Sequence, residues 1–319
     1  MKNEFEIICD ATKNYIKLTE SSDKTDYLLI QKLNNIVLSF EDRDYDFKFT
    51  KKVSKDENIK LAKEFFFKMN KDYYDILIER LNDGTFIFEN DYANVLTAYS
   101  EYDDIYKKRI IFIPLKGTIE DAFSIVHEFI HDLNIDINCE SFTRYFYTEG
   151  LSFLGELLFE DFLIEKGIKD SRIPNNLTLF AIKSKAIEID INLRLLSEYL
   201  DDMYIDFGKI MNVINDTKNE YVYDLVTVFK KIEEDEKLTL DNEQQYILGC
   251  FIGCYMYYRI KNNKKNINEF FELNDKLKEY KFSQVLDYLN LDYDTDDLSK
   301  NTYEIFTECY KKVLKRNYK

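Results

Sequence analysis

Only two prolines and eight glycines interrupt the 319 residues of this chain. Because these two residue types most often end helices and strands, their scarcity favours long helices over many short strands. Apolar residues recur at helical spacing through residues 57–81, and the pattern stops at Asn82-Asp83-Gly84. Further helices are expected at 146–166, 177–200, 221–234, 243–260, 267–280, 282–289 and 303–314.

Three short apolar stretches, 85–88, 95–99 and 109–114, have the composition of strands. Proline closes the third, as is typical of a strand end. The sequence therefore predicts a mainly α fold with a small β-sheet. Residues 1–55 show no clear pattern and are expected to form an N-terminal appendage, with residues 56–319 as the main domain.

The only two histidines, His127 and His131, stand four residues apart with Glu128 between them. On a helix, residues at i and i+4 share a face, so both imidazoles can bind one ion, and H-E-x-x-H is the pattern of a zinc site in which the glutamate acts as general base. Thr118 and Asp121 resemble a capping box, which predicts a helix that begins at Ile119 and carries both histidines.

A catalytic zinc ion needs three protein ligands and one open position. With no further histidine and no cluster of cysteines in the chain, a carboxylate from a neighbouring helix is expected as the third ligand. Glu149 is the first candidate, because Gly150, Ser152 and Gly155 would let two helices approach closely. Glu156, two turns later, either orients a histidine ring or replaces Glu149 as the ligand. A solvated acidic helix face is the plainer alternative for Glu149.

At these residues the sequence resembles the thimet oligopeptidase and oligoendopeptidase F family of zinc metallopeptidases, within the gluzincins. Residues 118–131 resemble the family's D-x-x-x-L-x-H-E-x-x-H helix, and Glu149 to Glu156 resemble its E-x-x-S-x-x-x-E helix. The resemblance covers residues 86–259. It implies one zinc ion between two helices in a cleft, with His127, His131 and Glu149 as ligands and Glu128 in catalysis.

Residues 246–257 resemble the family's tyrosine-bearing helix, in which a tyrosine hydroxyl stabilises the oxyanion. Tyr246 fits the motif position best and Tyr255 is the alternate; packing within a buried helix is an equal alternative for each. The chain departs from the family in its shorter length, in a shorter connection between the two metal-binding helices, and in lacking a downstream histidine. Access to the site is therefore expected to be wider, and activity weaker or differently tuned.

The expected function is hydrolysis of peptide bonds, with a zinc-activated water as nucleophile and peptides or unfolded polypeptide as substrates. The strand ending at Ile113 is expected to offer its edge to an extended peptide. One alternative is a toxin-like protease dedicated to a single protein. Another is a zinc-stabilised binding protein that has lost catalysis, although the intact Glu128 argues against it.

The net charge and the composition indicate which binding partners and which cellular compartment to expect. Sixty acidic residues against 44 basic ones give a formal charge of −16, which argues against nucleic acid and against anionic membranes. The first residues are acidic and no apolar core follows them, so secretion by a signal peptide is not expected, and the sequence has no apolar run long enough to cross a bilayer. Five scattered cysteines fit reduced thiols. A cytoplasmic protein is expected.

Overall fold

The computed structural model describes residues 49, 51–90, 97–103, 105, 107–134, 142–175, 178, 240–263, 266–276 and 289. The described residues from 49 to 178 and from 249 to 276 belong to one compact unit, and the first turns of helix α10, residues 240–248, belong to a second. The predicted helices at 177–200, 221–234, 282–289 and 303–314 fall on residues outside this description, apart from residues 178 and 289. The predicted boundary at residue 55 stays a prediction.

Two helices, α3 (Lys55–Met69) and α4 (Lys71–Asn82), replace the single helix predicted at 57–81. The prediction was wrong at Asn70, whose backbone is extended (φ −160°, ψ 126°) and whose side chain accepts a hydrogen bond from the amide of Asp72. The apolar spacing continues through this residue, so periodicity alone does not reveal the break. A polar cap stops one helix and starts the next.

The sheet has three strands, β1 (Phe86–Glu89), β2 (Tyr99–Asp103) and β3 (Lys108–Pro114), in the order β1-β3-β2. β3 pairs with β1 in parallel and with β2 antiparallel. The small β-sheet is thus confirmed, but its second strand spans residues 99–103 and shares only Tyr99 with the predicted strand at 95–99. The expectation that β3 offers its edge to a peptide was wrong, because β3 is the central strand and pairs with β1 along Ile111–Pro114 and with β2 along Lys108–Phe112.

Helix α5 (Glu120–Asn134) follows β3 and carries the two histidines. Its start agrees with the predicted cap to within one residue, but the hydrogen bonds differ from a capping box. The hydroxyl of Thr118 accepts from the amide of Glu120, whereas the carboxylate of Asp121 accepts from the amides of Lys116 and Gly117, both at 2.9 Å. Asp121 therefore ties the incoming loop to the first turn of the helix.

Helix α6 (Phe142–Glu165) is followed by the short helix η1 (Lys169–Arg172), and two later helices, α10 (Leu240–Asn263) and α11 (Ile267–Lys276), complete the described elements. α6 ends at Glu165, one residue before the predicted end, and Gly167 follows with a φ of +74°; its start at Phe142 is four residues earlier than predicted. None of the described helices has the length and apolar character needed to cross a membrane.

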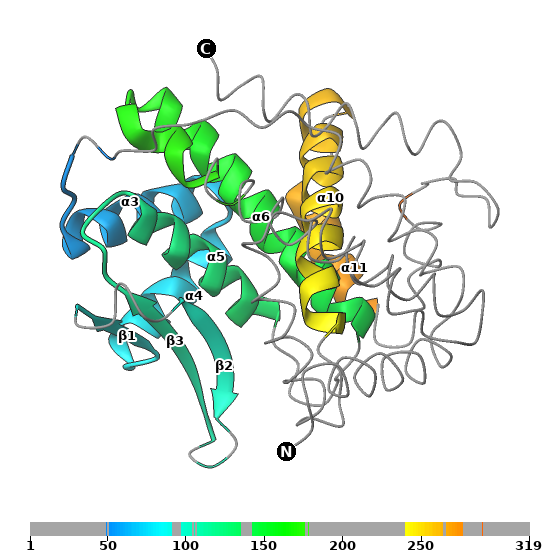
Figure 1. The fold of residues 1–319 in the computed structure, drawn as a ribbon, viewed down its shortest axis with the longest axis horizontal. Coiled ribbons are helices and arrows are strands. Elements are labelled where there is room, and N and C mark those ends of the chain that lie inside the picture. The colour runs from blue at the N-terminus through cyan, green and yellow to red at the C-terminus, as the bar shows by residue number, and fades with distance from the viewer. Residues whose placement is uncertain are drawn as a thin grey trace, which may run out of the picture. The chain divides into compact units, whose positions relative to one another are not determined.

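The core forms around α5, which packs against α3, α6 and the strands β2 and β3 (Figure 1). Aromatic rings connect these layers: Phe129 of α5 meets Phe66 of α3 at 4.9 Å between ring centroids, and Phe123 of α5 meets Phe159 of α6 at 5.0 Å. Val126 and Ile130 on the same helix are fully buried. α5 is therefore held on several sides, which fixes the direction in which its histidines point.

Candidate metal centre

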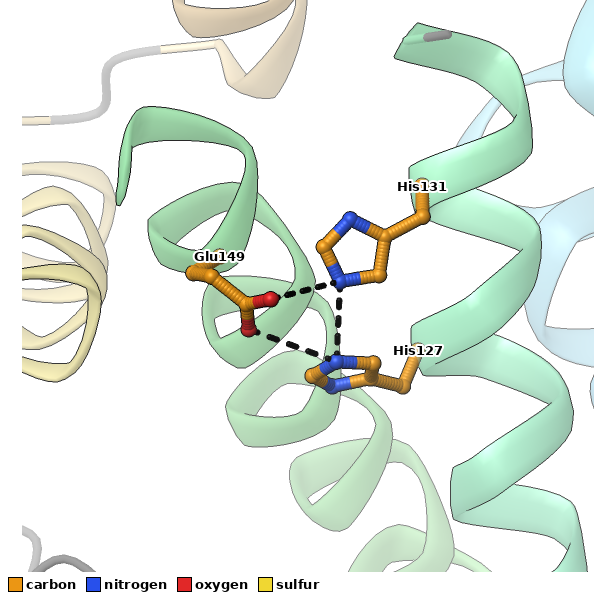
Figure 2. Close-up of side chains that lie close together, drawn as sticks. All are labelled: His127, His131 and Glu149. Atoms are coloured by element: carbon orange, nitrogen blue, oxygen red, sulfur yellow. Dashed lines mark hydrogen bonds and ion pairs between the residues drawn. The ribbon is translucent and has the colours of Figure 1, made fainter. Parts of the chain in front are cut away.

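His127 and His131 turn their imidazole rings toward one another from successive turns of α5 (Figure 2). Their Nε2 atoms lie 3.0 Å apart. The rings are partly exposed, whereas the apolar side chains of the same helix, apart from Leu133, are buried. One helix thus presents two nitrogen donors to a single point, as the i, i+4 spacing predicts.

Glu149 of α6 directs its carboxylate at the same point (Figure 2). Its Oε1 lies 3.3 Å from Nε2 of His131, and its Oε2 lies 3.6 Å from Nε2 of His127. Ligand atoms about 2.0–2.1 Å from a tetrahedral zinc ion are separated from each other by about 3.3 Å. The measured separations of 3.0, 3.3 and 3.6 Å scatter around that value, so the donor set fits zinc in both chemistry and spacing.

Small side chains allow α5 and α6 to approach closely enough for this arrangement. Gly155 faces Ile130 and Val126 of α5, where an added Cβ atom would collide with the end of the Ile130 side chain. The hydroxyl of Ser152 donates to the carbonyl oxygen of His127 at 3.2 Å. Gly150, expected at the same contact, instead faces Ile252 and Gly249 of α10. The sequence identified the close approach but assigned one of its glycines to the wrong neighbour.

Glu156, two turns beyond Glu149 on α6, accepts a hydrogen bond from Nδ1 of His127, with Nδ1 and Oε1 2.5 Å apart. A carboxylate can only accept, so this bond assigns the proton of the neutral ring to Nδ1 and leaves the lone pair on Nε2. Nε2 is the atom that faces His131 and Glu149. Of the two roles left open for Glu156, the geometry matches orientation of the ring.

The charges in this cluster influence one another. Burial opposes the charged form of His127, but hydrogen bonds to Glu149 and Glu156 outweigh it and raise the pKa of His127 well above its ordinary value. Burial alone would raise the pKa of Glu149, yet His131 and His127 lower it far below the usual range. Without a metal, the site therefore favours a protonated, cationic His127 beside the carboxylate anion of Glu149. A bound metal cation would take the place of the proton on His127.

Glu128 is 7% exposed and follows His127 directly on α5. Burial raises the pKa of its carboxyl group; the neighbouring imidazoles of His127 and His131 oppose that rise, and Glu149 and Glu156 add to it. A base with a raised pKa is better matched to proton transfer near neutral pH. Glu128 is thus a buried carboxylate beside the two imidazoles.

The two candidate tyrosines lie on α10. Tyr246 falls in the part of α10 whose side chains are not described. Tyr255 is buried, and its hydroxyl oxygen accepts a hydrogen bond from Nη1 of Arg259 at 2.8 Å. A role for either tyrosine in catalysis stays a prediction.

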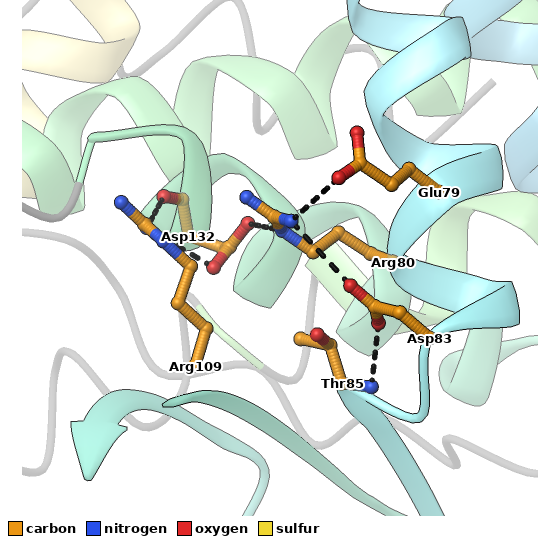
Figure 3. Close-up of polar contacts among 6 residues, drawn as sticks. All are labelled: Glu79, Arg80, Asp83, Thr85, Arg109 and Asp132. Atoms are coloured by element: carbon orange, nitrogen blue, oxygen red, sulfur yellow. Dashed lines mark hydrogen bonds and ion pairs between the residues drawn. The ribbon is translucent and has the colours of Figure 1, made fainter. Parts of the chain in front are cut away.

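A polar network that the sequence did not predict holds the last turn of α5 (Figure 3). Asp132, next to His131 and 1% exposed, accepts a hydrogen bond from Nε of Arg80 on α4 at 3.0 Å and from Nη1 of Arg109 on β3 at 3.2 Å. The same Nη1 donates to the backbone carbonyl of Asp132 at 2.5 Å. An acidic residue on a largely buried helix turn was the signal that could have indicated this network.

The sequence matches no protein-family model and no curated protein. Two solved structures share the fold. One is a protein from Chlamydophila abortus described as a candidate peptidase, 16% identical with a TM-score of 0.53, covering 99% of this chain and 55% of that one. The other is PZ peptidase A with inhibitor 2, 12% identical with a TM-score of 0.60, covering 97% of this chain and 58% of that one.

This chain thus spans a little more than half the length of either protein. At such low identities the likeness establishes the fold alone. The mainly helical architecture with a small three-stranded sheet is a fold found in structures described as peptidases.

Proposed function

We propose that this chain is a zinc-dependent metallopeptidase of the gluzincin type that hydrolyses peptide bonds in peptides or unfolded polypeptide. The observation that carries the proposal is the triangle formed by the two Nε2 atoms of His127 and His131 and the carboxylate of Glu149, with separations of 3.0–3.6 Å. The fold shared with structures described as peptidases supports it independently.

In this proposal His127, His131 and Glu149 bind the zinc ion, and Glu156 fixes the ring of His127 through Nδ1. Zinc held there supplies a Lewis acid that polarises a carbonyl group and lowers the pKa of water. Glu128 takes the proton from the attacking water and passes it to the leaving amine. Tyr246 or Tyr255 donates a hydrogen bond to the developing oxyanion.

The substrate's backbone is proposed to pair with β2 rather than with β3. β2 is at the edge of the described sheet, and it contacts α5, the helix that carries the histidines. Pairing with a strand edge holds a peptide through its main chain, with little dependence on its sequence. This mode suits a peptidase that acts on mixed peptides.

Purified wild-type protein, Glu128→Gln, Glu149→Ala and Glu156→Ala test the proposal together, with zinc measured by mass spectrometry of metals and turnover measured on a library of short peptides. Wild type and Glu128→Gln should each retain one zinc ion, and only the wild type should cleave. Glu149→Ala should lose zinc, whereas Glu156→Ala should retain it with weaker affinity.

Undiminished cleavage by Glu128→Gln would remove the proposed mechanism. Bound zinc with no cleavage of any peptide by the wild type would instead favour the zinc-stabilised binding protein. Cleavage of one protein but not of mixed peptides would favour the dedicated protease.

A further inference from the structure

Gly249 of α10 lies directly against the main chain of α6 at Glu149. A Cβ atom added at Gly249 would lie 2.5 Å from Cβ of Glu149, 3.2 Å from its carbonyl carbon and 3.1 Å from the amide nitrogen of Gly150. Non-bonded carbon atoms need about 3.5–4.0 Å. Any side chain at position 249 must therefore displace either α10 or the segment of α6 that carries Glu149.

The rest of this contact leaves α6 little room to move. One turn along α10, a Cβ atom at Gly253 would lie 2.8 Å from the carbonyl oxygen of Gly150 and 3.2 Å from the amide nitrogen of Leu154. Toward the other helix, Gly155 of α6 packs on Ile130 of α5. The main chain of α6 thus packs directly against α10, and the opposite side of α6 packs closely against α5, the helix that carries both histidines.

We infer that Gly249 is a positioning residue that sets the distance of the Glu149 carboxylate from His127 and His131. This inference rests on the proposed zinc site. Relieving the contact at Gly249 requires a displacement of about 1 Å, whereas ligand distances in a zinc site tolerate about 0.2 Å. Through this contact α10 therefore fixes the position of Glu149 in the metal centre, although Gly249 itself supplies no ligand.

Gly249→Ala and Gly253→Ala form a matched pair for the test. Both substitutions lie on the same helix and the same helix contact, and both bring the same gain of about 1 kcal/mol in intrinsic helix propensity. Only the first places its methyl group against Glu149. Competition with a chromophoric chelator gives the zinc dissociation constant, and thermal unfolding gives the stability of each variant.

Gly249→Ala should weaken zinc binding by about 10- to 100-fold, the range found when groups that hold a metal ligand are altered. Gly253→Ala, whose methyl group meets the carbonyl oxygen of Gly150 and not Glu149 itself, should lose similar thermal stability with a clearly smaller loss of zinc affinity. Wild-type zinc affinity in Gly249→Ala would overturn the inference. So would a loss of affinity that is equal in both variants, because that would reflect general loosening of the helix contact.

A second measurement needs no metal. In the presence of a chelator, Glu149→Gly removes the Cβ atom that position 249 would meet, so Gly249→Ala should destabilise this background less than it destabilises the wild type. Gly253→Ala should destabilise both backgrounds equally. Absence of this coupling would overturn the inferred contact. A wild-type protein that binds no zinc would overturn the proposed function, whereas equal zinc affinity with and without the Gly249 substitution would overturn this inference alone.

Discussion

The Oε1 atom of Glu156 lies 2.5 Å from Nδ1 of His127. Both residues are fixed on packed helices, α6 and α5, and Glu156 is 6% exposed. The bond determines which ring nitrogen carries the proton, and so which nitrogen faces Glu149. In the proposed zinc site, a residue that is not itself a ligand would therefore decide whether His127 can bind the ion.

Replacing Glu156 should weaken zinc binding, and more so when the hydrogen-bond acceptor is lost than when only its charge is lost. Glu156→Gln keeps an acceptor oxygen but loses the charge, and the zinc dissociation constant should rise about tenfold; Glu156→Ala removes the acceptor, and the rise should approach about 100-fold. Competition titration with a chelator measures both values.

Glu160→Gln is the matched control for this prediction. Glu160 lies one turn further along α6 and is also buried, but its Oε2 accepts a hydrogen bond from Asn175 at 2.6 Å. Zinc affinity should stay unchanged in this variant even if its stability falls. Equal loss of affinity in the Glu156→Gln and Glu160→Gln variants would assign the effect to disturbed packing of α6.

Asp132→Asn tests the network in Figure 3. The substitution keeps the shape of the side chain but removes the anion that Arg80 and Arg109 share. The free energy of unfolding should fall by about 3 kcal/mol, the lower end of the range for losing one member of a buried ion pair, because both arginines are partly exposed. Urea denaturation of the chelated protein measures it.

Glu79→Gln is the control for the same network. Glu79 also approaches Arg80, at 3.7 Å, but its side chain is 68% exposed. An exposed pair of this kind contributes about 0–1 kcal/mol, so the variant should unfold almost as the wild type does. Similar losses at Glu79 and Asp132 would contradict the view that burial gives the network its strength.

The grouping of the two histidines with Glu149 could be predicted because it depends mostly on helical spacing. His127 and His131 are one turn apart, and Glu149 and Glu156 are two turns apart, so each pair shares a helix face wherever the helices lie. Only the approach of one helix to the other remained to be inferred, and small residues at Ser152 and Gly155 indicated it.

The features that escaped prediction depend on contacts between distant segments. Arg109 reaches Asp132 across 23 residues, and Gly249 meets Glu149 across 100, and no local pattern marks either pair. The break between α3 and α4 was missed for a different reason. Asn70 interrupts the helix with a polar cap while the apolar spacing continues around it.

Zinc binding should strengthen as pH rises. In the metal-free protein, burial opposes the charged form of His127, but Glu149 and Glu156 raise its pKa well above the ordinary 6.5. Zinc needs the neutral ring, so each ion bound below that raised pKa displaces a proton, and affinity should change by about tenfold per pH unit there. Calorimetric titration in buffers of different ionisation enthalpy measures the proton release.

The free energy of unfolding of the metal-free protein should fall as pH rises. The pKa of His127 is higher in the folded protein than in the unfolded chain, where it is near 6.5. Protonated His127 therefore contributes its full stabilisation below pH 6.5, and this contribution is lost as pH rises through the pKa of the folded state. The difference in melting temperature between zinc-loaded and chelated protein should therefore widen from pH 6.5 upward. A constant difference across that window would contradict the assignment of His127 as a ligand.

Asp121→Ala should destabilise the start of α5 without altering the metal centre. The carboxylate accepts hydrogen bonds from the amides of Lys116 and Gly117, which would lose their acceptor, and loss of such a side-chain cap costs about 1–2 kcal/mol. Glu120→Ala is the neighbouring control, because Glu120 pairs with Lys116 at the surface, a contact worth about 0.2–0.5 kcal/mol. Urea denaturation should separate the two variants, while chelator competition should give both of them wild-type zinc affinity. Loss of affinity in Asp121→Ala would mean that the loop before α5 helps to position His127, six residues further along the helix.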